Sequence, residues 1–304
     1  MVTINDRQAQ AGFSLVEMIV AILIMSIIAI GLTQFISFSA EGYVKSADRN
    51  QLTSTGRIVI ERITKELRNA LPNSVRTTDV FIAGDNEVVF GGLFPGDQCL
   101  EYLPILGAST YIDPVFHPGS GSMEFDAVEF NLDISEVDGA YTVIFPRNPS
   151  QLYDSSLPSP GYIAAFDNLN VGSTLSDTHT INLTNPHKYR RRSALDRVYL
   201  VDEPVSFCVN GDNLFRYADY GLFDTQLIPT NPAGACPLSS ACLPATTADK
   251  RILIASNLAN DGFTAFDQLA ATLRRNAIVQ IELNFEKEGE SVALNHEVML
   301  PSAP

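Results

Sequence analysis

Gly12-Phe13-Ser14-Leu15-Val16-Glu17-Met18 leads directly into a segment without a charged residue, Met18 to Ala40. This segment has about 23 residues, and at about 1.5 Å per helical residue it is long enough to cross the hydrocarbon core of a bilayer. Glu17 stands at the N-terminal end of the apolar run. A carboxylate close to lipid is costly unless it has a partner, so Glu17 indicates a specific interaction.

The stretch from Ala11 to Met18 resembles the cleavage site of type IV prepilins and type II secretion pseudopilins. In that family a short leader ends in Gly, the next residue is usually Phe, and a Glu follows four residues later. The resemblance implies that residues 1–12 are a leader peptide and that prepilin peptidase cuts between Gly12 and Phe13. It also implies N-methylation of Phe13 and a role for Glu17 in subunit assembly.

The charges are consistent with that processing. Cleavage would give Phe13 a free cationic amine, with Glu17 one helical turn along on the same face, and the helix dipole favours an acid at this end. In a bundle of such helices, Glu17 can instead reach the amine of a neighbour and set the axial register, because a buried charge without its partner is strongly destabilising. The alternative is a Glu at the membrane edge that is solvated by lipid headgroups.

A cleaved secretory signal is the main alternative for the N-terminus. It requires a basic start, a short apolar core and a small-residue cleavage site, and Ser37-Phe38-Ser39 offers such a site. However, the leader carries Asp6 beside Arg7, and Glu17 interrupts the approach to the apolar core.

The helical pattern continues beyond the apolar run. No proline occurs from Glu41 to Leu71, and apolar residues recur at three- and four-residue spacing towards the end of this stretch. We therefore predict one helix over 13–71, membrane-spanning over about 13–40 and amphipathic over 41–71. Pro72 and Asn73 end it, and its apolar stripe should lie against a sheet.

Residues 72–304 have β character. Period-two alternation is clearest in two strands near the C-terminus, over 279–286 and 292–300, joined by a turn at Lys287-Glu288-Gly289-Glu290. Further predicted strands are Glu87–Leu93, Met123–Ile134, Tyr141–Phe145, Arg197–Val201, Val205–Val209, Asn213–Tyr217 and Arg251–Ser256. The stretches 146–161, 167–180 and 224–249 are predicted loops. The fold class is therefore α+β, a long N-terminal helix packed on a large antiparallel β-rich domain.

The net charge of −15 weighs against nucleic-acid binding. The run Lys188-Tyr189-Arg190-Arg191-Arg192 departs from this acidic background. It either docks an acidic neighbour or lipid headgroups, or is a solvated loop, and the solvated loop is the simpler interpretation.

Four cysteines, Cys99, Cys208, Cys236 and Cys242, all follow the apolar segment. Four cysteines allow three pairings. Cys236 and Cys242 flank a short loop, which favours a pair between them and leaves Cys99 with Cys208, although sequence alone does not decide. We find no catalytic motif, no cofactor-binding motif and no metal-site spacing, so we expect no enzymatic activity.

Further resemblances narrow the family. The segment from Ile58 to Ala70 is similar to the helix of J-type pseudopilins and PilW-like minor pilins. The stretches Cys99–Pro104, Tyr199–Val209 and Asn213–Tyr217 resemble minor prepilins of the mannose-sensitive haemagglutinin (MSHA) pilus. Major pilins are usually about half this length, so the size fits a minor subunit.

These resemblances imply a non-enzymatic subunit that primes or caps a type IV, MSHA-type pilus. Its partners would be other minor and major pilins, prepilin peptidase and the inner-membrane assembly platform. It would cross the inner membrane once, hold residues 72–304 in the periplasm and enter the pilus at or near the tip. The alternatives are a J-type pseudopilin of a type II secretion system and a tip adhesin that binds a receptor through loops 146–161 or 224–249.

Overall fold

The computed structural model describes residues 14–77, 99–130, 132, 137, 139–171, 177–229, 242–244, 250–259, 264–269 and 276–301. The chain divides into two compact units, residues 1–51 and 52–304. The first unit carries the N-terminal part of helix α1 (Leu15–Arg68), and the second carries the rest of that helix and the described strands.

Helix α1 ends at Arg68, so the predicted end at residue 71 was three residues too late. The amides of Asn69 and Ala70 bond three residues back, to the carbonyls of Glu66 and Leu67. The amide of Leu71 then leaves the helix and donates to the Leu103 carbonyl at 2.8 Å. Pairing with a neighbouring segment therefore ends the helix before Pro72 does.

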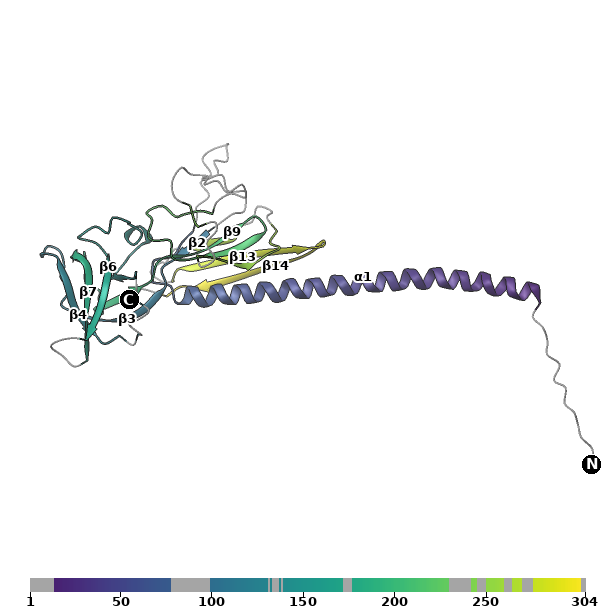
Figure 1. Ribbon diagram of the computed structural model, residues 1–304, viewed down its shortest axis with the longest axis horizontal. Helices are drawn as coiled ribbons and strands as arrows, with labels where there is room; N and C mark the ends of the chain where they lie inside the picture. Colours follow the sequence, from purple (N-terminus) through teal and green to yellow (C-terminus); the bar gives the residue numbers. More distant parts are fainter. Residues whose placement is uncertain are drawn as a thin grey trace, which may run out of the picture. The chain divides into compact units, whose positions relative to one another are not determined.

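The strands form three antiparallel assemblies (Figure 1). The five-stranded sheet has the order β1 (Arg76–Thr77), β2 (Cys99–Tyr102), β9 (Val205–Asn210), β10 (Asn213–Tyr217), β11 (Arg251–Ala255). The three-stranded sheet has the order β12 (Phe266–Leu269), β13 (Ile278–Lys287), β14 (Glu290–Met299). A closed barrel has the order β3 (Ile105–Ile112), β4 (Ser122–Val128), β7 (Thr178–His187), β6 (Ile163–Val171), β5 (Tyr141–Val143), β8 (Arg197–Val201). A short 3₁₀ helix covers Pro149–Gln151.

The barrel is an insertion into the five-stranded sheet. Strands β2 and β9 are direct neighbours, with Cys99 opposite Cys208 and Tyr102 opposite Val205. The chain leaves the sheet after β2, forms the whole barrel and returns in β9. In Figure 1 the barrel strands β3, β4, β6 and β7 group together beyond the sheets.

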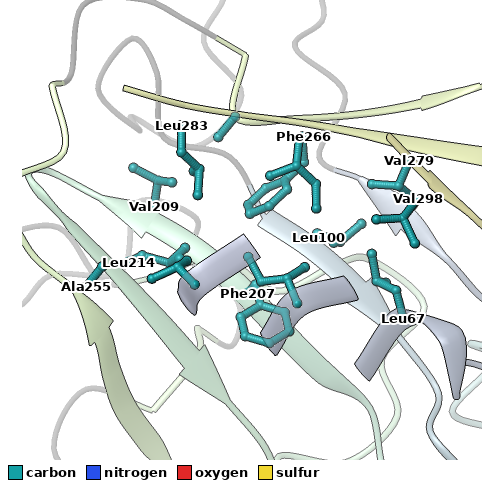
Figure 2. Close-up of a cluster of buried hydrophobic side chains, with 14 of the residues drawn as sticks. Leu67, Leu100, Phe207, Val209, Leu214, Ala255, Phe266, Val279, Leu283 and Val298 are labelled. Atoms are coloured by element: carbon teal, nitrogen blue, oxygen red, sulfur yellow. The ribbon is translucent and has the colours of Figure 1, made fainter. Parts of the chain in front are cut away.

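The main core lies between the two open sheets, with the end of α1 inside it. The cluster joins Leu67 of the helix with Leu100 and Phe207 of the five-stranded sheet and with Val279 and Val298 of the three-stranded sheet (Figure 2). The buried helix residues are Leu52, Gly56, Val59, Ile63, Thr64 and Leu67. The expectation that the amphipathic half lies against a sheet is thus confirmed, with two sheets rather than one.

Gly56 marks the closest approach of the helix to the β13–β14 hairpin. A Cβ atom at this position would collide with Leu294 Cδ1 and would lie 2.9 Å from Phe285 Cε2. Glycine fits here because a Cβ atom would require the Leu294 and Phe285 side chains to move.

The barrel has a core of its own, built from aromatic and aliphatic side chains that include Tyr111, Phe125, Phe166 and Tyr189. A smaller cluster with Leu71, Leu103 and Val201 lies where the barrel strands leave the sheet. The inserted barrel therefore has the separate core that an independently stabilised module requires.

Several strand predictions need correction. The stretch 167–180 was wrongly predicted as a loop, because it contains the end of β6 and the start of β7. Asp, Asn and Gly are depleted in strands, and the exposed Asp167 and Asn168 at a register shift hid the alternation. The strand predicted to reach Ile134 ends at Val128. Besides β6 and β7, strands β1, β2, β3 and β12 were not predicted, and residues 87–93 lie outside the described residues.

The remaining predicted strands are confirmed to within two residues at each end: β5, β8, β9, β10, β11, β13 and β14. The final turn is also confirmed, with Glu288 and Gly289 at φ angles of 51° and 80°, as a tight hairpin requires. The chain is an α+β protein with one long N-terminal helix packed on a large antiparallel β-rich domain.

Candidate functional site

The N-terminal candidate site begins where α1 begins. Ser14 precedes the helix, and its Oγ accepts a hydrogen bond from the Glu17 amide at 3.2 Å. The Ser14 carbonyl accepts from the Met18 amide, also at 3.2 Å. Ser14 is therefore the N-cap, and the exposed Glu17 lies in the first turn, where the helix dipole favours an acid. Gly12 and Phe13 lie outside the described residues.

The apolar part of α1 exposes hydrophobic side chains throughout. From Leu15 to Phe38 every large hydrophobic residue is at least 48% exposed. The two hydroxyl side chains in the middle are satisfied within the helix: Ser26 Oγ donates to the Ile22 carbonyl at 2.7 Å, and Thr33 Oγ1 donates to the Ala29 carbonyl. The helix is long and apolar enough to cross a membrane, and its hydroxyls need no outside partner there.

The second half of α1 is fixed to the β-domain by a polar network around Glu66. Glu66 Oε2 accepts from the Tyr102 hydroxyl of β2 at 2.6 Å and from Arg216 Nε of β10 at 2.9 Å. Glu66 Oε1 accepts from Arg62 Nε at 3.3 Å. Burial raises the pKa of the Glu66 carboxyl, but the bonds from Tyr102 and Arg216 outweigh burial, so the pKa lies below its ordinary value.

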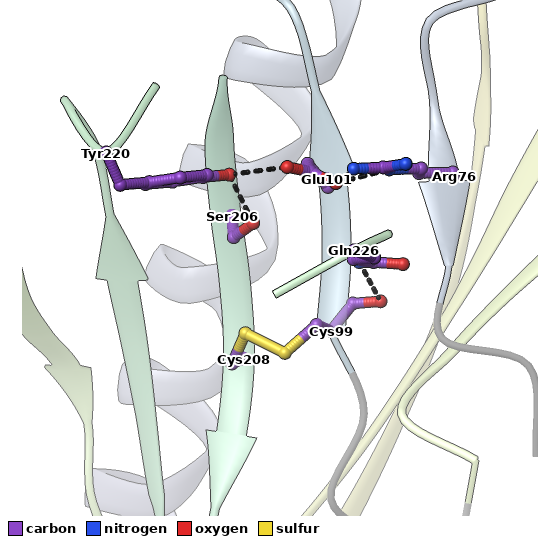
Figure 3. Close-up of a disulfide and its surroundings, with 7 residues drawn as sticks. All are labelled: Arg76, Cys99, Glu101, Ser206, Cys208, Tyr220 and Gln226. Carbon is purple, nitrogen blue, oxygen red and sulfur yellow. Dashed lines mark hydrogen bonds and ion pairs between the residues drawn. A yellow bond between two sulfur atoms is a disulfide. The ribbon is translucent and has the colours of Figure 1, made fainter. Parts of the chain in front are cut away.

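A buried carboxylate, Glu101, lies on β2 next to Tyr102 (Figure 3). It forms an ion pair with Arg76 of β1 and accepts a hydrogen bond from the Tyr220 hydroxyl at 2.8 Å. Arg76 also donates to the carbonyls of Phe223 and Asp224, at 2.8 Å each. Burial raises the pKa of Glu101 despite the opposing charge of Arg76. The network ties β1 and the chain after β10 to the sheet.

The sheet also carries a disulfide between Cys99 of β2 and Cys208 of β9 (Figure 3). Both cysteines are buried, and Gln226 Nε2 donates to the Cys99 carbonyl at 3.2 Å. The bond closes the neck of the inserted barrel, because the two cysteines are 109 positions apart and all six barrel strands lie between them in the sequence. Cys242 is also disulfide-bonded, whereas Cys236 lies outside the described residues.

The basic run lies between β7 and β8, on the barrel. Tyr189 is buried, and the four cations around it are exposed or half-exposed. The backbone of Lys188, Tyr189 and Arg190 is hydrogen-bonded on both sides. The run is thus a loop between β7 and β8 with solvent-exposed cations, as the simpler interpretation had it, but its backbone is anchored to the barrel through Tyr189. Within the described ranges, no group of three His, Cys, Asp or Glu side chains is placed to bind a metal ion.

Three features were missed from the sequence. The Ser14 cap has a recognisable signal, because Ser14 and Glu17 have the spacing of a capping box. Gly56 interrupts an amphipathic stretch without an evident turn, which is itself a signal of close packing. The partners of Glu66 have no such signal, because Tyr102 and Arg216 are brought to it only by the tertiary fold.

Residues 7–33 match the family model of the prokaryotic N-terminal methylation motif. Comparison with curated proteins and with solved structures gave no match in either case. The motif covers the end of the predicted leader, the predicted cleavage site and the first part of α1. The match implies processing by prepilin peptidase and assembly with pilins, and together with the apolar helix it fits anchoring in the inner membrane. The motif and the helix that follows it support a place for this chain in the type IV pilin and pseudopilin family.

Proposed function

We propose that this chain is a minor pilin-like subunit that primes or caps a type IV pilus of the MSHA type. Prepilin peptidase removes residues 1–12 and methylates the amine of Phe13. The pilin helix then begins at the mature N-terminus and ends at Arg68, and residues 72–304 form a periplasmic domain. The observation that supports this most strongly is the methylation motif over 7–33, which continues into a helix with exposed apolar side chains on all sides.

An apolar helix that a single chain leaves exposed must be covered by something other than water. Lipid covers it before assembly, and the helices of neighbouring subunits cover it in a fibre. Glu17 is the only charged residue from Ser14 to Ala40. In the fibre it pairs with the methylated amine of an adjacent subunit, which fixes the height at which two helices pack. We infer that Glu17 places this subunit beneath another one, since a subunit at the apex has no amine above it.

The size of the β-domain supports a minor role over a major one. The domain contains an inserted barrel with its own core and a disulfide at its neck. A β-domain of this size suits a subunit that is present in few copies at one end of a fibre. The resemblance of Tyr199–Val209 and Asn213–Tyr217 to MshO, a minor prepilin-like protein of the MSHA system, is our reason for proposing this system within the family.

Two alternatives have support of their own. Similarity of Ile58–Ala70 to J-type pseudopilins favours a subunit of a type II secretion system. The inserted barrel favours a tip adhesin, because it supplies a separate module for a receptor. Counting pili, measuring protein export and measuring attachment in a deletion strain separates the three: the proposal predicts loss of pili, the pseudopilin predicts loss of export, and the adhesin predicts normal pili that do not attach.

Substitution of Glu17 tests the assembly role. Glu17→Ala should be cleaved and methylated normally but should be missing from sheared fibres, with at least a tenfold lower ratio of fibre to membrane protein on immunoblots. Glu41→Ala is the matched control, because it removes an exposed helical carboxylate whose partner is Lys45 at 3.0 Å. Normal incorporation of Glu17→Ala would refute the proposed role of this carboxylate.

A further inference from the structure

The barrel carries a dense group of cations in an otherwise acidic chain. Lys188, Arg190, Arg191, Arg192 and Arg197 lie within ten residues of one another, although the whole chain has a net charge of −15. We call these five residues the basic surface. The four arginines are exposed and the lysine is half-exposed. Among the described residues, none of the five forms an ion pair with a carboxylate.

The backbone beneath this surface is held from two sides. The Tyr189 amide donates to the Val115 carbonyl at 2.9 Å, and the Tyr189 carbonyl accepts from the His117 amide at 3.0 Å. On the other side, the Gly161 amide donates to the Lys188 carbonyl at 3.1 Å, and the Arg190 amide donates to the Gly161 carbonyl at 2.8 Å. Tyr189 thus forms isolated parallel β-bridges with Phe116 on one side and Gly161 on the other.

Tyr189 anchors the segment in the barrel core. It is 1% exposed, and its hydroxyl lies 2.7 Å from Thr142 Oγ1. Its ring packs edge-on against Phe125 and His187, with centroid distances of 5.8 and 4.8 Å. Successive side chains of an extended segment point to opposite faces, so burial of Tyr189 turns Lys188 and Arg190 outward.

Two of the guanidinium groups are themselves positioned. Arg190 Nε donates to the Pro160 carbonyl at 3.0 Å, and the Arg192 guanidinium lies 4.8 Å from the centre of the Phe116 ring. The nearby acid Asp196 is engaged with the Tyr111 hydroxyl. A positioned guanidinium loses little side-chain entropy when it binds a ligand, so such groups are preorganised for recognition.

We propose that the basic surface docks a carboxylate-rich patch on a neighbouring protein. Four of its five cations are arginines, whose planar forks bind carboxylates through two parallel hydrogen bonds. Five neighbouring cations that form no ion pair among the described residues repel one another, and an anionic partner relieves that repulsion. An extended polyanion such as a membrane surface would also meet the acidic remainder of this chain, whereas a compact acidic patch meets only the arginines.

A synthetic carboxylate probe tests this. The full chain, held in neutral-lipid nanodiscs, is titrated with fluorescent poly-L-glutamate and, separately, with phosphatidylglycerol vesicles. The Arg190→Gln/Arg191→Gln/Arg192→Gln variant should bind poly-L-glutamate at least tenfold more weakly than the unaltered chain at 50 mM salt. The difference should shrink at 300 mM salt, because salt screens charge contacts at a surface.

The matched control is Arg57→Gln/Arg147→Gln/Lys250→Gln, which removes the same charge from exposed positions elsewhere. It should bind within twofold of the unaltered chain. Equal weakening in both variants would mean that only net charge matters and would overturn the proposal. Binding to vesicles but not to poly-L-glutamate would also overturn it, in favour of a lipid-binding surface.

An Arg190→Lys/Arg191→Lys/Arg192→Lys variant keeps the charge but loses the planar guanidinium fork. Its affinity for poly-L-glutamate should lie between the affinity of the unaltered chain and that of the arginine-to-glutamine variant. Equal melting temperatures of all variants exclude unfolding as the cause. The experiment involves neither cleavage nor fibre assembly, so a negative result leaves the proposed pilus role intact.

Discussion

Arg216 on β10 donates from Nε to Glu66 Oε2 on α1 over 2.9 Å, across 150 residues of sequence. The same carboxylate oxygen accepts from the Tyr102 hydroxyl at 2.6 Å. One helix residue thus holds two strands of the five-stranded sheet. The contact fixes the rotation of the helix about its axis, which apolar packing alone specifies less tightly.

Glu66→Gln should lower the free energy of unfolding of the β-domain by about 1–3 kcal/mol at pH 7, because Arg216 loses its charged partner. The folded-state pKa of Glu66 is lowered, so its stabilisation is present above the unfolded pKa and is lost as the pH falls through the folded pKa. The variant and the unaltered chain should therefore converge in acid. Denaturant unfolding at pH 7 and pH 3 measures this, with the exposed Glu61→Gln as control. A constant difference at both pH values would contradict the role of the charge.

Gly56→Ala should destabilise the domain, because the new Cβ would collide with Leu294 and lie 2.9 Å from Phe285 Cε2. We expect a loss of about 1–3 kcal/mol, typical of overpacking. Gly42→Ala is the matched control: nothing lies within 4 Å of its added Cβ, and alanine favours the helix by up to about 1 kcal/mol. In thermal unfolding, the melting temperature should fall in Gly56→Ala and rise in Gly42→Ala. Equal melting temperatures of the two variants would show that the helix does not pack as described.

The disulfide at the neck of the barrel should contribute strongly to stability. Cys99 and Cys208 are 109 residues apart, and loop-closure entropy for a ring of that size corresponds to about 4–5 kcal/mol. The Cys99→Ala/Cys208→Ala variant should unfold at a much lower denaturant concentration than the unaltered chain. A loss below about 1 kcal/mol would show that the β2–β9 pairing holds the neck without the bond.

His187 should make the barrel sensitive to acid. It is 5% exposed, its Nε2 has no hydrogen-bond partner among the described residues, and burial lowers its pKa to about 4. The unfolded chain, with a His pKa of about 6.5, binds the proton more readily, so stability falls as the pH drops from 7 towards 4. His187→Leu should remove up to about 3 kcal/mol of this pH dependence. The control His296→Leu, at an exposed position, should keep this pH dependence. An unchanged dependence of stability on pH in His187→Leu would contradict the role given to His187.

Local patterns predicted much of the fold. The apolar run after Glu17, the helix stripe ending near Leu67 and the final hairpin all have a strong period in the sequence, and each is present in the structure. Strands such as β6 and β7 have no clear period, because Asp167 and Asn168 stand exposed at a register shift. That the barrel is an insertion could not be predicted, because it depends on the pairing of β2 with β9, and the whole barrel lies between these two strands in the sequence.

The same distinction holds for the candidate sites. Glu17 and the residues around Gly12 follow a short linear motif, so they could be read directly from the sequence. The anchoring of the basic run could not, because it depends on residues 188–190 bonding to segments at 115–117 and 161. A charge run looks the same in a free loop and in a loop that is anchored to a barrel.

N-terminal mass analysis of the chain extracted from membranes tests the central claim most directly. If this chain is a processed pilin-like subunit, its N-terminal peptide starts at Phe13 and carries one additional methyl group on the amine, and both changes disappear in a strain without prepilin peptidase. A mature chain that starts at Met1, or after the Ser37-Phe38-Ser39 site, would contradict the account.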